Sequence, residues 1–137
     1  MRKETITYTD YNGLEKTEDF YFHFTDAEVM ELELTTNGGL VETMQQMVKS
    51  KDVPSIVASV KNILLKAYGV KSPDGRRFIK SPELSTEFSQ TPAYSILWMQ
   101  IVQDDKKAAE FFTEVIPKAK QTAQSNENHP ALKSVNN

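Results

Sequence analysis

The chain contains 137 residues, which suits one domain of ordinary size with a core of its own. It has no cysteine, so disulfides, thiolate nucleophiles and cysteine-based metal sites are excluded. Its 16 basic and 19 acidic residues give a net charge of −3, which offers no electrostatic drive toward nucleic acid or an anionic membrane. Because no apolar run reaches transmembrane length and 39% of the residues are hydrophobic, we expect a soluble intracellular protein.

Residues 1–24 are predicted to form a β-hairpin. The run Thr5-Ile6-Thr7-Tyr8 alternates β-branched and aromatic residues, and Asn12-Gly13 tolerates the left-handed backbone angles that a tight turn needs. The returning segment, 17–24, places Phe20, Phe22 and Phe24 on one face. Since an isolated hairpin is marginally stable in water, we expect this phenylalanine row to pack against helices.

Residues 25–69 are predicted to be helical. Thr25 and Glu28 have the spacing of a capping box, so a first helix begins there. Apolar residues at helical spacing in 40–48 indicate a second helix. Asp52 is expected to cap a third helix, and Gly69 is expected to end it in a left-handed conformation.

Residues 70–80 are predicted to form a loop or a short hairpin around the turn sequence Ser72-Pro73-Asp74-Gly75, and 81–117 are predicted to form the C-terminal helices. Ser81-Pro82 and Thr91-Pro92 each place a hydroxyl cap before a proline at the first helical position. Asp104 or Asp105 offers a further cap midway, and Pro117 stops the run.

These elements predict an α+β fold that is mostly α-helical. The N-terminal β-hairpin is expected to pack on a bundle of about four to five helices, as a single globular domain spanning 1–117. After residue 117 the apolar periodicity stops, so 118–137 are expected to form a disordered polar tail.

No constellation of residues with catalytic, cofactor-binding or metal-binding spacing is found in the sequence. His23 and His129 lie far apart and match no ligand motif, and Gly38-Gly39 lacks the Lys-Ser/Thr that completes a phosphate-binding loop. Carboxylates at Glu28, Glu31 and Glu33 are better explained as a solvated helix face. The basic group Lys71, Arg76, Arg77 and Lys80 is better explained as a charged hairpin tip than as a phosphate contact, because no aromatic residues interleave with it. We therefore expect no enzymatic activity.

One apolar stripe runs along the C-terminal helices, and two explanations for it remain open. It fills the core, as is usual for a small domain that must bury Trp98 and Phe112, or it docks a partner helix. Methionines beside the apolar faces suit either role, because methionine adapts to irregular surroundings. The residues expected to bind a partner are Tyr94, Leu97, Trp98, Ile101, Phe111 and Phe112, with Met44 and Met47 as helpers.

Several short motifs follow one another along residues 3–117. They are the segments 5–11, 17–22, 38–40, 68–69 and 88–91, the sequence Lys71-Ser72-Pro73-Asp74-Gly75-Arg76-Arg77-Phe78, Ala93-Tyr94, and Ala108-Ala109-Glu110-Phe111-Phe112 running to Ile116-Pro117. By the number and order of these motifs, the chain resembles the tail assembly chaperone family of siphophages and prophages of Gram-positive bacteria.

The resemblance implies a protein that binds the tape measure protein, a very long helical protein with exposed apolar stripes, and keeps it soluble until tail-tube subunits polymerise around it. The major tail protein and further copies of the chain are additional candidate partners. The resemblance implies that the chain acts in the cytoplasm of the host bacterium and is absent from the mature virion. The alternatives are a structural phage protein, such as a minor tail or head–tail joining component, and, more weakly, a DNA-binding regulator that uses Arg76, Arg77 and Lys80.

Overall fold

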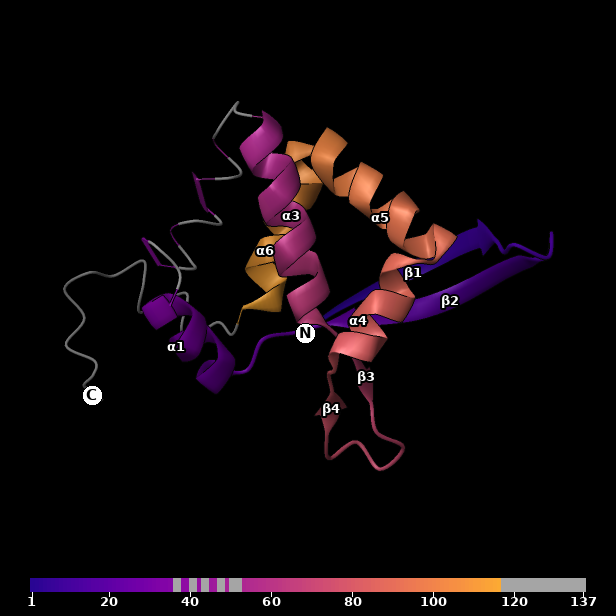
Figure 1. Ribbon diagram of the computed structural model, residues 1–137, viewed down its shortest axis with the longest axis horizontal. Helices are drawn as coiled ribbons and strands as arrows, with labels where there is room; N and C mark the ends of the chain where they lie inside the picture. Colours follow the sequence, from indigo (N-terminus) through magenta and orange to yellow (C-terminus); the bar gives the residue numbers. More distant parts are fainter. Residues whose placement is uncertain (36–37, 40–41, 43–44, 47–48, 50–52, 117–137) are drawn as a thin grey trace.

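The computed structural model describes residues 1–35, 38–39, 42, 45–46, 49 and 53–116 (Figure 1). In chain order, its elements are β1 (Arg2–Thr9), β2 (Glu15–Phe22), α1 (Asp26–Thr35), α3 (Val53–Ala67), β3 (Tyr68–Lys71), β4 (Phe78–Ile79), α4 (Pro82–Ser89), α5 (Pro92–Gln103) and α6 (Asp105–Val115). The predicted α+β, mostly helical fold is confirmed. Most of the helix predicted in 40–48, its neighbour Asp52, the stop at Pro117 and the tail at 118–137 lie outside the described residues.

The strands form one antiparallel sheet in the order β1-β2-β3-β4. The predicted hairpin is confirmed, with β1 and β2 paired from Arg2↔Phe22 to Thr9↔Glu15, although the returning strand spans 15–22 instead of 17–24. Their turn is held by the carboxylate of Asp10, which accepts hydrogen bonds from two backbone amides at 2.9 Å. The sequence did not indicate that β3 adds to β2 beside Tyr21, so that the second hairpin extends the first. Figure 1 shows the two hairpins projecting from the helices in different directions.

Gly69 has a different role from the one that the sequence suggested. The prediction that it ends the third helix in a left-handed conformation is wrong, because α3 leads directly into β3 and the φ angle of Gly69 is not positive. A Cβ atom at this position would lie 2.6 Å from Cε2 of Phe78 and 2.9 Å from the carbonyl oxygen of Ile79. Glycine is therefore required because β4 and the Phe78 ring approach the backbone closely.

The predicted helix starts are confirmed by their hydrogen bonds. The side chains of Ser81 and Thr91 each accept a bond of 3.1 Å from the backbone amide three residues ahead. Thr25 and Glu28 form a reciprocal capping box, with bonds of 2.8 and 3.1 Å. Asp104 caps α6 and so separates it from α5. Each cap satisfies amides that have no partner within their own helix.

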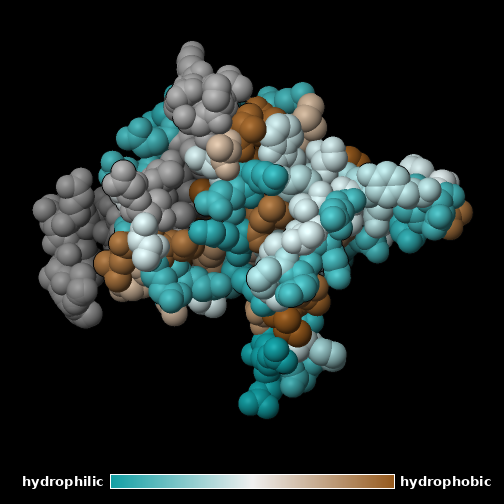
Figure 2. All heavy atoms as spheres, viewed as in Figure 1, coloured by the Kyte–Doolittle hydropathy of each residue, from teal (hydrophilic) through white to brown (hydrophobic). Residues whose placement is uncertain are grey.

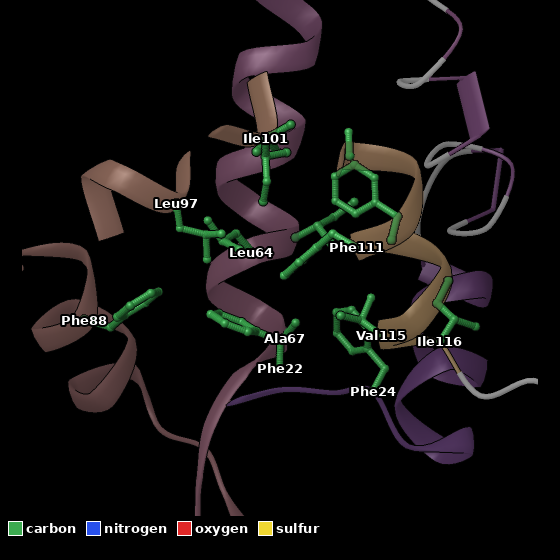
Figure 3. Close-up of a cluster of buried hydrophobic side chains, with 14 of the residues drawn as sticks. Phe22, Phe24, Leu64, Ala67, Phe88, Leu97, Ile101, Phe111, Val115 and Ile116 are labelled. Carbon is green, nitrogen blue, oxygen red and sulfur yellow. The ribbon is translucent and has the colours of Figure 1, made fainter. Parts of the chain in front are cut away.

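The core lies between one face of the sheet and helices α3 to α6, and Val29 of α1 is also buried in it. Figure 3 shows core side chains from helices α3 to α6 converging with Phe22 and Phe24. Phe22 is completely buried, and its ring centroid lies 5.7 Å from that of Phe88 and 5.2 Å from that of Phe111. The phenylalanine row of the hairpin thus packs against α4 and α6, as predicted. Such tilted and edge-on ring pairs stabilise the packing beyond the apolar area that they bury.

Candidate functional site

The structure separates the residues predicted to bind a partner into two groups. Leu97, Ile101, Phe111 and Phe112 lie in the core, where each is less than 5% exposed. Tyr94 and Trp98 are partly buried and pack against the core from its edge. Met44 and Met47 lie outside the described residues.

The division into buried and partly buried residues follows from which side of α5 faces the core. Ala93, Leu97 and Ile101 recur every four residues and point inward, so they occupy one side of the helix. Tyr94 and Trp98 follow one position later and therefore lie at the border between the core and the surface. The Tyr94 ring stands edge-on to Phe88, with centroids 5.5 Å apart, and burial raises the pKa of its hydroxyl.

Tyr94 and Trp98 line a hollow of about 600 Å³ at the surface. Its walls come from the turn of the first hairpin, from α3, and from the end of α4 and the start of α5. The described lining residues are Tyr11, Val57, Ala58, Lys61, Ser89, Gln90, Thr91, Tyr94, Ser95 and Trp98. Tyr11 is 85% exposed, so much of its ring is free to contact another molecule.

A second hollow of about 600 Å³ lies between α3 and the start of α4. It is lined by Ala58, Lys61, Asn62, Leu65, Lys66, Lys80, Ser81, Pro82 and Ser85. The two hollows share Ala58 and Lys61, and we refer to them together as the α3 groove. α4 is tied to the far end of this groove by the Ser85 hydroxyl, which donates a hydrogen bond of 3.0 Å to the carbonyl oxygen of Leu65. Figure 2 shows hydrophobic atoms between α3 and α4, bordered by hydrophilic ones.

One local feature of α3 indicates this groove in the sequence. The inward side of α3 is Val60, Ile63, Leu64 and Ala67. Leu65 falls off that side; it directly precedes Lys66 and lies one helical turn after Lys61. An apolar side chain on this lysine-bearing face indicates a surface hollow. The neighbouring elements that complete the walls are distant in sequence and were not predictable from this pattern.

The basic cluster predicted at the second hairpin is not one site. Lys80 Nζ turns back into the molecule, where it donates to the carbonyl oxygen of His23 at 2.7 Å and pairs with Glu28 at 2.9 Å. Lys71 Nζ lies 4.1 Å from the centroid of the Tyr21 ring. Arg76 and Arg77 remain exposed near the turn. Glu28 is thus partly buried and paired, and the prediction that it belongs to a solvated face is wrong.

The shifted pKa values around Lys80 have structural causes. Burial lowers the pKa of His23, and the positive charges of the N-terminus and Lys80 lower it further. Burial also lowers the pKa of Lys80, against the raising effect of Glu28. Burial opposes ionisation of Glu28, but hydrogen bonds from Lys80 and Thr25 hold the pKa of this carboxyl below its ordinary value.

Neither a cluster of metal ligands nor a membrane-spanning helix is found among the described residues. Among residues 1–35, 38–39, 42, 45–46, 49 and 53–116, no three side chains of the types His, Asp and Glu come together as a metal site. No helix in this part of the chain is long and apolar enough to cross a membrane.

The described fold is α+β and mostly helical, with the partly buried Tyr94 and Trp98 at the α3 groove. The profile of the family described as "Phage tail assembly chaperone" matches residues 1–137. The chain therefore belongs to the phage tail assembly chaperone family, as its motifs predicted. No curated protein matches the chain, and no solved structure matches it.

Proposed function

We propose that the chain binds the tape measure protein and keeps it soluble while the phage tail is assembled. Membership of the tail assembly chaperone family supports a role on a tail protein. The observation that carries the choice of site is the hollow lined by Tyr94 and Trp98, whose rings are only partly buried. Grooves lined by aromatic side chains are a recurrent way of holding one apolar face of an amphipathic helix.

The binding surface is restricted to the residues that a partner reaches in this conformation. Tyr94 and Trp98 supply the aromatic wall, and Tyr11 adds an exposed ring from the hairpin turn. Leu97, Ile101, Phe111 and Phe112 act indirectly, because their burial fixes the positions of α5 and α6. Met44 and Met47 remain proposed helpers.

The contact is proposed to be weak at each site and effective through repetition. A hollow of about 600 Å³ takes only a few side chains, so one copy covers a short part of a long partner. Many copies along one chain give net coverage through multivalency, and subunits that polymerise around the partner displace them one by one. The chain would then work in the host cytoplasm and leave before the virion is complete.

The proposed role requires no catalysis. The polar groups with shifted pKa values serve as supports of the fold: Glu28 caps α1 and pairs with Lys80, while Asp10 and Asp74 accept hydrogen bonds within the two hairpin turns. Each of these carboxylates is thus engaged by neighbouring groups that hold local structure.

The experiment is co-expression with the tape measure protein of the same phage, followed by measurement of its soluble fraction. We expect the wild-type chain to keep the partner soluble and Trp98→Ala to lose most of this effect. Met99→Ala is the matched control, because Met99 is an exposed apolar residue of the same helix that is not among the residues lining either hollow. The proposal fails if the partner precipitates equally with and without the chain. Mass spectrometry of purified particles tests the expected absence from the virion.

A further inference from the structure

We propose that the α3 groove selects helical segments whose apolar stripe is bordered by Asp and Glu side chains. This inference rests on the proposed function and adds a chemical rule for which parts of a partner are bound. Three features carry it: the length of the groove, the placement of two lysines, and the direction in which nearby carboxylates point.

The groove is as long as a site for a short helix. Its described lining on α3 runs from Val57 to Lys66, which is about 14 Å at the rise of an α-helix. The opposite wall changes along this length from Pro82 and Ser85 at one end to Tyr94 and Trp98 at the other. A partner helix of two to three turns would contact both hollows, with apolar side chains against Leu65 at one end and the aromatic pair at the other.

Lys61 and Lys66 flank the apolar part of α3. At about 100° of rotation per residue, Ala58, Leu65 and Asn62 lie between these two lysines around the helix axis, and the first two are apolar. Both lysines are exposed, and neither forms an ion pair with another residue that the structure describes. Lys80 also lines the groove, but its ammonium group is already held by Glu28. Two lysine ammonium groups thus border the part of the groove floor that Ala58 and Leu65 form.

On α4, the helix opposite α3, the acidic side chains lie on the side that faces away from the groove. α4 presents Pro82, Ser85 and Ser89 to the hollows. Its acidic residues, Glu83 and Glu87, fall on the opposite side at helical spacing. No Asp or Glu is among the lining residues in the described part of the chain. The groove thus has one sign of charge at its border, although the whole chain is acidic, and it favours partners of the opposite sign.

The test uses two labelled peptides of about 18 residues, long enough to form helices. Both carry a leucine stripe at helical spacing; one has Glu beside the stripe and the other has Lys at the same positions. Fluorescence anisotropy measures their binding to the full chain and to two variants. Lys61→Glu/Lys66→Glu reverses the charges of the groove. Lys3→Glu/Lys106→Glu changes the net charge equally at exposed positions that are not among the residues lining either hollow.

We expect the wild-type chain to bind the Glu peptide about tenfold more tightly than the Lys peptide in low salt, a preference that added salt weakens. Lys61→Glu/Lys66→Glu should reverse this preference, and Lys3→Glu/Lys106→Glu should keep it. Equal binding of both peptides, or the same preference in both double variants, overturns the inference. If binding still depends on Trp98 in that case, the proposed function survives without the charge rule. If neither peptide binds and Trp98→Ala has no effect in co-expression, both fail.

A second copy of the chain is the competing occupant. α1 has the same chemistry as the proposed partner, since Met30 and Leu34 are 50% and 79% exposed and Glu31 lies between them. Sedimentation velocity distinguishes this case. Self-association that disappears in both Lys61→Glu/Lys66→Glu and Met30→Glu/Leu34→Glu, without peptide binding, would assign the groove to a second copy and overturn the inference.

Discussion

Glu4 Oε1 lies 3.0 Å from Lys107 Nζ, although the two are 103 positions apart in the chain. The other carboxylate oxygen of Glu4 lies 2.7 Å from Nε of Arg2, and the side chain is only 7% exposed. Glu4 therefore joins the first strand to the last described helix through a carboxylate on the core side of the sheet. Nothing in the local sequence marked Glu4 for this role.

Replacing Glu4 with alanine should destabilise the fold by about 2 kcal/mol. Removing one partner from a buried ion pair costs about 3–5 kcal/mol, and the effect here is smaller because Arg2 and Lys107 keep access to water. Urea unfolding measures the change. Glu110→Ala removes an exposed carboxylate from α6 and should shift the free energy of unfolding by less than about 0.5 kcal/mol. Equal effects of the two substitutions would contradict a structural role for Glu4.

Stability should fall with acid partly through Glu28. Its pKa is held below the ordinary value of 4.5 in the folded chain, so the unfolded chain takes up the proton first as the pH falls. The stabilisation is present above the unfolded pKa and is lost as the pH falls through the folded pKa. Glu28→Gln should therefore be less stable than the wild type at pH 7, with a smaller difference near pH 4.

The measurement for Glu28 is the urea midpoint at several pH values. Glu31→Gln removes an exposed carboxylate from the same helix and should follow the wild-type pH profile. A constant difference between Glu28→Gln and the wild type at every pH would contradict the assignment.

Gly69→Ala should destabilise the fold by about 2 kcal/mol, because the new methyl group collides with the Phe78 ring and with the backbone of Ile79. Thermal unfolding followed by circular dichroism measures the loss. In a double-mutant cycle, Gly69→Ala should cost less when Phe78 is already leucine, since part of the obstacle is gone. Strict additivity of the two substitutions would show that the ring is not the obstacle.

Leu97 and Trp98 are adjacent in the chain, but truncating the first should mainly reduce stability and truncating the second should mainly reduce partner binding. Leu97→Ala leaves a cavity in the core and should cost about 3 kcal/mol of stability. Trp98→Ala removes a side chain at the edge of the groove, so it should cost less stability and abolish most of the effect on the tape measure protein. Denaturant unfolding and the co-expression assay together check this pair. A larger stability loss for Trp98→Ala than for Leu97→Ala would place the tryptophan in the core.

Local signals predicted much of the fold because their physics is local. The Asn12-Gly13 turn, the Thr25–Glu28 capping box and the Ser81 and Thr91 caps each act within a few residues, and all four are present. The number and order of short motifs also predicted the family. Adding β3 to β2 was not predictable, since pairing between distant strands depends on how the helices place them.

The candidate site was predicted only in part. The periodicity of the C-terminal helices predicted the apolar stripe correctly. It did not predict which residues of the stripe are buried in the core. That choice depends on the rotation of α5 against β1, α3 and α6, which buries Leu97 and Ile101 and leaves Tyr94 and Trp98 at the border. Lys61 and Lys66 line a groove only because α4 packs beside α3 and forms the opposite wall.

By itself, the sequence determined the elements with their caps and turns, and the family to which the chain belongs, because these depend on short segments and their order. The tertiary structure decided which apolar residues fill the core, which carboxylates are paired, and where a groove remains. Those outcomes depend on contacts between residues far apart in the chain, such as Glu4 with Lys107 and Leu65 with Ser85, and no local pattern encodes the geometry of such contacts.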